Sequence, residues 1–146
     1  MKARRASTNQ HLRTRRDHAN ETAEDYVEAI ADIELERDRC RVTDLAERFA
    51  VSHVTVSKTL VRLKKEGLVT AQPYGPVQLT DAGEKLAKDS KSRHELVLQF
   101  LRSLGVSDEV AAIDAEGIEH HVSQETIECM RKFCDRSNRS PKANHP

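Results

Sequence analysis

The stretch from residue 42 to residue 80 constrains the fold most, because its apolar spacing changes from helical to alternating within it. Residues 42–49 carry apolar side chains at helical intervals, and residues 50–52 follow as a tight turn. In the next segment, to about Glu66, Val56, Leu60 and Leu63 recur at i, i+4 and i+7. Gly67 is then suited to end the second helix. The pattern predicts a helix–turn–helix.

Two short runs of alternating apolar and polar residues come next, at 68–72 and 77–80, joined by turn-forming residues at 73–76. A hairpin directly after the second helix is a wing. The other segments favour helices: residues 21–36, a long helix from about 80 to 101, one that Ser107 caps, and one from Ser123 to Phe133. The predicted fold is mainly α, an N-terminal winged helix–turn–helix with a small two-stranded wing followed by an all-helical domain.

The second helix of a winged helix–turn–helix enters the DNA major groove, and its N-terminal half meets the base edges. The methyl groups of Val54 and Thr55 suit thymine, and Lys58 can reach a guanine edge or a phosphate. Winged helices also serve as protein-interaction modules, but the small, hydroxyl-bearing surface favours DNA. The predicted DNA-binding residues are Ser52, His53, Val54, Thr55, Ser57, Lys58 and Arg62.

The bulk composition excludes several other classes of protein. Charged residues make up 33% of the 146 residues, there is no Trp, and no apolar run approaches the roughly 18 residues that a membrane span needs. The N-terminus shows no apolar signal-peptide segment. Cys40, Cys129 and Cys134 are scattered without a C-x-x-C spacing, which fits a reducing compartment. We expect a cytoplasmic protein without a membrane partner.

Charge is unevenly distributed along a chain whose formal net charge is zero. Residues 1–20 hold six basic residues against Asp17 alone, a net charge of +5. Such an arm could track DNA phosphates, or it could be a disordered, solvating tail without a specific partner. The sequence predicts disorder for this arm and for a polar tail at 135–146.

A candidate metal site lies near the C-terminus, where Glu116, Glu119 and His120 are spaced i, i+3 and i+4. If the segment is helical, the three side chains project from one face. Two carboxylates and an imidazole suit hard divalent ions. Asp25 and Glu28 are also three residues apart, but by themselves they are read as a helix-capping residue and a surface charge.

Four segments in this order resemble the diphtheria-toxin-repressor family of metal-dependent transcription regulators, and within it the manganese-responsive branch. They are Asp25-Tyr26-Val27-Glu28, Leu79-Thr80-x-x-Gly83 after the helix–turn–helix, Arg93-His94, and the run from Asp114 to His121. The resemblance covers about residues 21–134. It implies that six residues bind metal, namely Asp25, Glu28, His94, Glu116, Glu119 and His120. In the iron-responsive branch the positions of Asp25 and Glu116 typically hold Met and Cys.

The resemblance also implies a function and a division of the chain. It implies a homodimeric regulator that binds two Mn²⁺ ions per protomer, binds a palindromic operator in double-stranded DNA, and represses manganese-uptake genes. The expected domains are a winged helix–turn–helix at 21–83 and a helical metal-binding and dimerisation domain at 84–134. Three alternatives stay open: an Fe²⁺- or Zn²⁺-responsive regulator, a di-metal hydrolase, and a scaffold whose acidic cluster is only solvated. No nucleophile, base and orienting group can be assigned for an enzyme.

Overall fold

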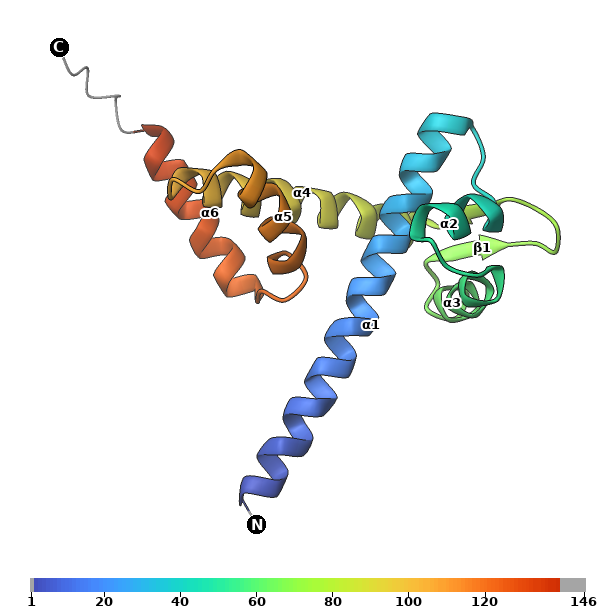
Figure 1. Ribbon diagram of the computed structural model, residues 1–146, viewed down its shortest axis with the longest axis horizontal. Helices are drawn as coiled ribbons and strands as arrows, with labels where there is room; N and C mark the ends of the chain where they lie inside the picture. Colours follow the sequence, from blue (N-terminus) through green and yellow to red (C-terminus); the bar gives the residue numbers. More distant parts are fainter. Residues whose placement is uncertain (1, 140–146) are drawn as a thin grey trace. The chain divides into compact units, whose positions relative to one another are not determined.

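The computed structural model describes the backbone of residues 2–139 and the side chains of residues 11–139 (Figure 1). The chain forms two compact units, residues 1–90 and residues 91–146. The boundary between the two units lies within a helix. Each unit has a hydrophobic core of its own.

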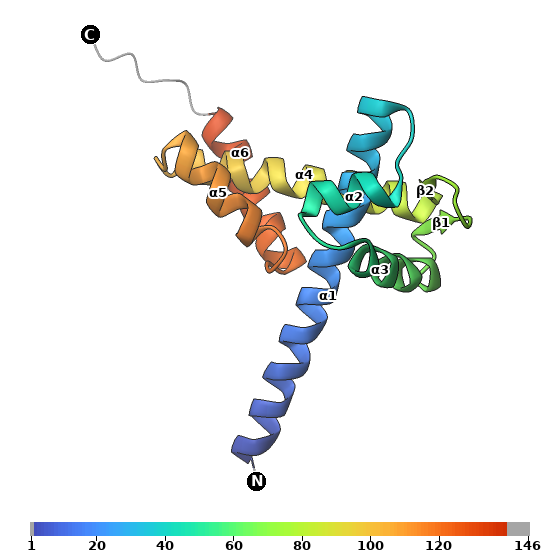
Figure 2. The ribbon, with the colours of Figure 1, turned by 45° about the vertical axis from the view of Figure 1, so that its right-hand side comes forward.

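The N-terminal unit is a winged helix–turn–helix. It contains α1 (Lys2–Arg37), α2 (Val42–Phe49), α3 (His53–Lys65), β1 (Val69–Ala71), β2 (Val77–Leu79) and the first turns of α4 (Asp81–Ser103) (Figure 2). The two strands pair antiparallel, with Val69 opposite Leu79. The predicted fold class, mainly helical with a two-stranded wing, is confirmed.

One continuous helix, α1, replaces the predicted disordered arm and the separate helix from residue 21. Residues 2–37 contain neither Gly nor Pro, so nothing in the backbone interrupts the helix. Thr22, which the sequence suggested as an N-cap, lies in the middle of the helix, and its hydroxyl donates to the carbonyl of His18 at 3.0 Å. That is a bond back to residue i−4, which helix-interior Thr residues make.

The turn of the helix–turn–helix depends on one backbone conformation and one side-chain cap. Ala50 takes the left-handed conformation at the end of α2, with φ of 52°. The Ser52 hydroxyl then caps α3 by accepting from the Thr55 amide at 3.1 Å. Gly67, with φ of 74°, follows the last turn of α3, as expected for a helix-terminating glycine.

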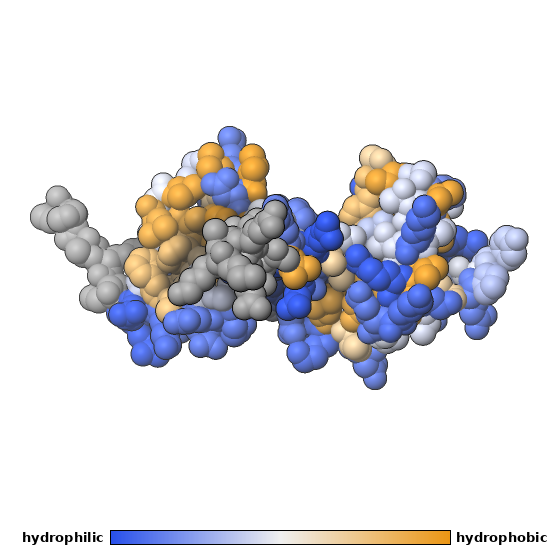
Figure 3. All heavy atoms as spheres, turned by 90° about the horizontal axis from the view of Figure 1, so that it is seen from below, coloured by the Kyte–Doolittle hydropathy of each residue, from blue (hydrophilic) through white to orange (hydrophobic). Residues whose placement is uncertain are grey.

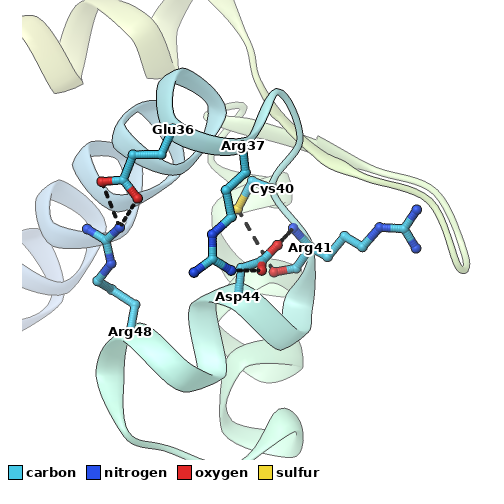
Figure 4. A network of polar contacts seen from close by, with 6 residues as sticks. All are labelled: Glu36, Arg37, Cys40, Arg41, Asp44 and Arg48. Carbon is cyan, nitrogen blue, oxygen red and sulfur yellow. Dashed lines mark hydrogen bonds and ion pairs between the residues drawn. The ribbon is translucent and has the colours of Figure 1, made fainter.

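Polar contacts fasten α2 to the end of α1 (Figure 4). Arg37 donates to Asp44 at 2.8 Å, and Arg48 pairs with Glu36 at 3.1 Å. Asp44 also accepts from the backbone amide of Arg41 at 2.9 Å, which caps α2. The rings of Tyr26 in α1 and Phe49 in α2 also stack, with centroids 4.5 Å apart. The part of α1 between Tyr26 and Arg37 is thereby held against α2.

The C-terminal unit consists of the rest of α4, α5 (Asp108–Ile118) and α6 (Gln124–Arg139). Ser107 and Ser123 cap α5 and α6, as predicted, by accepting from Val110 at 3.4 Å and from Thr126 at 3.2 Å. Val97, Ala115 and Ile127 form the buried core. Helix α6 passes the predicted end at Phe133 and continues to Arg139, because no Pro or Gly interrupts it before Pro141. Residues 140–146 of the predicted polar tail lie outside the described residues.

The surface of the C-terminal unit carries apolar side chains, seen at the left of Figure 3. Four large apolar residues of this unit are exposed: Leu104, Val110, Ile113 and Phe133. Among the described residues, no helix has the length and apolar character to cross a lipid bilayer.

Candidate metal site and nucleic-acid interface

The C-terminal unit brings together four of the six predicted metal ligands. His94 projects from α4, Glu116 from α5, and Glu119 and His120 from the turn that follows α5. Nδ1 of His94 lies 2.7 Å from Oε2 of Glu119 and 4.0 Å from Oε1 of Glu116. Nε2 of His120 lies 3.1 Å from the other Glu119 oxygen. A single carboxylate therefore sits between two imidazoles.

The expectation of a continuous helix through this motif is only partly right. Helix α5 ends at Ile118, and Glu119 keeps helical backbone angles while His120 belongs to the following turn. The amide of Glu119 still bonds to Ala115, whereas that of His121 bonds to Ile118, three residues back. The last turn therefore tightens, which is common at helix ends. Arg93 donates to the carbonyl of Glu119 at 3.3 Å and holds this turn against α4.

Burial makes Glu119 unusual. It is 3% exposed, and the side chain of His120 is 2% exposed, whereas Glu116 remains 72% exposed. Oε2 of Glu119 is buried and accepts no hydrogen bond from the described residues, although Nδ1 of His94 lies close to it. If Nδ1 of His94 carries no proton, two electron-pair acceptors face one another at 2.7 Å. A cation bound by both would satisfy them, so the donor set fits a divalent metal.

The N-terminal unit holds the other two predicted ligands, Asp25 and Glu28, three residues apart on α1 and both half-buried. The hydroxyl of Ser90, itself 1% exposed, donates to Oε1 of Glu28. This bond fixes the orientation of the carboxylate. Sequence reasoning missed Ser90, since a lone serine inside a helix carries no signal of such a role. The reading of Asp25 as a helix cap is wrong, because α1 begins long before it, and Glu28 is half-buried rather than an exposed surface charge.

The predicted DNA-reading surface lies on the outside of α3. Ser52, His53, Val54, Thr55, Ser57 and Lys58 are all exposed, and Val56, Leu60 and Leu63 form the buried side. The hydroxyls of Ser52 and Thr55 lie 3.0 Å apart and bond to each other. Val61, which is not among the predicted DNA-binding residues, is 56% exposed. It follows Val54 by seven residues and Lys58 by three, so the three side chains share one side of α3.

Arg62 differs from the other predicted DNA contacts. Arg62 is half-buried, and its guanidinium group makes two contacts: Nη2 donates to the carbonyl of Ala19 at 3.1 Å, and Nε pairs with Glu66 at 3.5 Å. Arg62 thus ties α3 to α1. Lys64 similarly donates to the carbonyl of Ala71 in the wing at 2.7 Å. On the exposed side of the first turns of α3, Lys58 forms neither an ion pair nor a hydrogen bond with the residues that the structure describes.

Two family descriptions match the chain over nearly its whole length. Residues 18–77 match the N-terminal DNA-binding domain of the iron-dependent repressors, and residues 80–145 match their metal-binding and dimerisation domain. The chain belongs to the iron-dependent repressor family. Its helix–turn–helix is therefore a DNA-binding domain, and its C-terminal unit contains a metal-binding and dimerisation domain. The chain is accordingly a transcription regulator, and the hydrolase alternative is wrong.

Relatives of this chain include the transcriptional regulator MntR of Escherichia coli, which is 49% identical over 119 residues, 82% of this chain and 77% of the relative. MntR of Bacillus subtilis is 41% identical over 105 residues, 72% of this chain and 74% of the relative. Among solved structures, a manganese-dependent transcriptional repressor in complex with manganese is similar, with a TM-score of 0.68 and 32% identity over 77% of this chain. The chain spans about half of that repressor's length, 52%.

Proposed function

We propose that this chain is a Mn²⁺-dependent, homodimeric repressor of manganese-uptake genes, acting in the cytoplasm on a palindromic operator. The observation that carries the metal dependence is the buried carboxylate of Glu119, with one oxygen that no described donor satisfies and an imidazole on each side. A buried carboxylate without a counter-charge is costly, so this arrangement favours a bound cation.

The proposed ligand set is the one that the family resemblance implies, and the charges of its members support it. Asp25, Glu28, Glu116 and Glu119 together carry four negative charges, which two divalent ions balance, and His94 and His120 add neutral nitrogen donors. When bound, Mn²⁺ supplies positive charge and oxygen-preferring coordination. In its absence the carboxylates repel one another.

The ligands belong to both units of the chain, which suggests how the metal controls DNA binding. Asp25 and Glu28 lie on α1, the helix to which α2 and α3 are fastened. The other four belong to the dimerisation unit. We propose that the six residues bind metal jointly, which restrains the reading helices of the dimer. Half-sites lie about 34 Å apart, so restraint of that spacing controls affinity.

Two carboxylate side chains support manganese, rather than iron, as the metal that this chain binds. Asp25 and Glu116 stand where the resemblance places sulfur ligands in the iron-responsive branch, and hard oxygen donors reduce the advantage of softer ions. The similarity to regulators named MntR points the same way. A similar solved structure is that of ScaR with bound Zn²⁺. The test below therefore measures DNA binding with each metal, and not only the binding of metal to the protein.

The test is a DNA-binding titration with Mn²⁺, Fe²⁺, Zn²⁺ and chelator. The probe is a palindromic duplex obtained by in vitro selection with the Mn²⁺-loaded protein. We expect tight binding with Mn²⁺ that chelator abolishes. Glu119→Gln should lose at least roughly tenfold in metal affinity, whereas Glu128→Gln, an exposed control on α6, should behave as the wild type. Metal-independent binding of the duplex would contradict the proposal.

A second variant tests metal selectivity. Asp25→Met restores the sulfur donor of the iron-responsive branch, so the DNA-binding response should broaden towards Fe²⁺ and Zn²⁺ relative to Mn²⁺. The measurement is the metal concentration that gives half-maximal DNA binding for each ion. If the half-maximal concentrations of Mn²⁺, Fe²⁺ and Zn²⁺ keep the same order and the same ratios as in the wild type, Asp25 does not set metal selectivity.

A further inference from the structure

The first half of α1 precedes residue 18, where the family's DNA-binding domain begins. Its sequence repeats a pattern of three basic residues, Lys2-x-Arg4-Arg5 and Arg13-x-Arg15-Arg16, after an interval of eleven residues. In an α-helix eleven residues make three turns to within about 20°, and they rise about 16 Å. Each triplet spreads over about 160° of the circumference, so the two triplets occupy the same half of the helix.

The described part of this segment is exposed to solvent. The side chains of residues 11–16 are exposed, and Arg13 pairs with Asp17 at 3.8 Å. Arg15 and Arg16 form neither an ion pair nor a hydrogen bond with the residues that the structure describes. Asp17 is the single acidic residue among the first twenty, so the positive charge of this helix is not neutralised within the segment.

The basic side of this helix is also the side that faces the helix–turn–helix. Arg16, Ala23 and Ile30 recur at intervals of seven residues, and Ala23 and Ile30 are buried in the core of the N-terminal unit. Between them Ala19 accepts the hydrogen bond from Arg62 of α3. The side of α1 that faces the core thus continues towards the N-terminus as a basic stripe, beyond the point where α3 contacts the helix. The described residues of this basic stripe are Arg13, Arg15 and Arg16.

We propose that the basic stripe of α1 binds the phosphate backbone of duplex DNA beside the half-site that α3 reads. Anionic phosphates complement the surplus charge, and the stripe leaves the N-terminal unit on the side of the reading helix. Phosphate contacts of this kind position a protein without reading sequence. The proposal rests on the DNA binding proposed above, and it assigns a function to a segment outside the family's domain.

The test compares a charge-removing and a charge-keeping variant in the Mn²⁺-loaded, full-length protein. The first carries Arg13→Gln, Arg15→Gln and Arg16→Gln, and the second carries Arg→Lys at the same positions. Affinity is measured between 50 and 200 mM salt on the selected duplex with flanking sequence. If three phosphate contacts are lost, the slope of log affinity against log salt falls by up to about 2.7. The ratio of wild-type affinity to variant affinity should therefore shrink roughly 40-fold between 50 and 200 mM salt. The Lys variant should keep the wild-type slope.

A matched control removes three exposed positive charges from α6, with Arg131→Gln, Lys132→Gln and Arg136→Gln. It should change the salt slope far less than the α1 variant does. On a duplex trimmed to the palindrome, the wild type and the α1 Gln variant should converge. An unchanged slope in the α1 Gln variant, an equal loss in the Lys variant, or an advantage that survives trimming would each overturn the proposal. Failure of the wild type to bind at all would instead overturn the proposed function.

Discussion

Single side chains in this protein are buried where their chemistry is most constrained, and Cys40 is one such residue. It is 0% exposed, its backbone bridges to Val77 of the wing, and Asp44 and Glu34 lie near enough to act on it. Burial, with a further contribution from these two carboxylates, raises the pKa of the Cys40 thiol to about 12. Cys40 is therefore a neutral packing residue at neutral pH.

This raised pKa predicts a pH dependence of stability. An unfolded Cys ionises near its ordinary value of 9.0, while folded Cys40 keeps its proton to about 12. Its contribution to stability is therefore complete below about 9 and is lost as the pH rises towards 12. Urea unfolding between pH 8 and 11 should show a steeper fall for the wild type than for Cys40→Ala, and parallel curves would contradict the assignment.

Native-state alkylation checks the same environment independently. At pH 8 iodoacetamide should modify Cys129, which is exposed, while Cys40 and Cys134, which are buried, should react only after unfolding. Mass spectrometry of the digested protein distinguishes the three sites. Rapid labelling of Cys40 in the folded protein would show that the helix–turn–helix opens locally.

At the scale of elements, Gly83 determines how closely α4 approaches the wing. A Cβ at this position would lie inside the van der Waals contact of the Leu68 carbonyl oxygen, which is backbone and cannot move aside. Gly83→Ala should therefore lower the free energy of unfolding by about 3 kcal/mol. Gly117 in α5 has no atom within 4 Å of the same position, so Gly117→Ala should raise stability by up to about 1 kcal/mol. Denaturant unfolding of both variants provides the matched comparison.

Sequence patterns predicted the elements well where a local signal defines them. Ser52, Ser107 and Ser123 mark helix starts, and Gly67 marks a helix end, because capping is decided by a few neighbouring residues. The errors arose where no such signal exists. No capping signal in residues 2–20 indicates that a helix starts before Thr22. No signal after Ile118 predicts the tightened turn that carries Glu119 and His120.

The predicted metal ligands came from two sources of different strength. Glu116, Glu119 and His120 could be found from spacing, whereas Asp25, Glu28 and His94 came only from the family resemblance. The structure brings His94 beside Glu119 through the packing of α4 on α5, a tertiary contact that no spacing encodes. Ser90 escaped prediction for the same reason, since it contacts Glu28 from 62 positions away in the chain.

At the scale of the whole molecule, dimerisation requires an apolar surface on the C-terminal unit. Ile113 of α5 is 73% exposed, and Val110 and Leu104 in the same unit are exposed too. Ile113→Asp places a charge on this surface and should raise the dimer dissociation constant by at least about 30-fold. Leu35→Asp, at an 86% exposed position of the N-terminal unit, is the control and should leave the dimer intact. Sedimentation equilibrium measures both, and a dimeric Ile113→Asp protein would move the interface elsewhere.

The unbroken course of α1 has a mechanical consequence. Asp25 and Lys2 belong to one helix, so a stiff rod about 35 Å long separates a proposed metal ligand from the start of the basic stripe. Because buried residues on both sides of Asp25 pack α1 into the N-terminal unit, the helix turns only with that unit, and a rotation of the unit by about 10° around Asp25 would move the far end of α1 through roughly 6 Å. The helix would then act as a lever, converting a small adjustment at the ion into a large displacement along the DNA backbone.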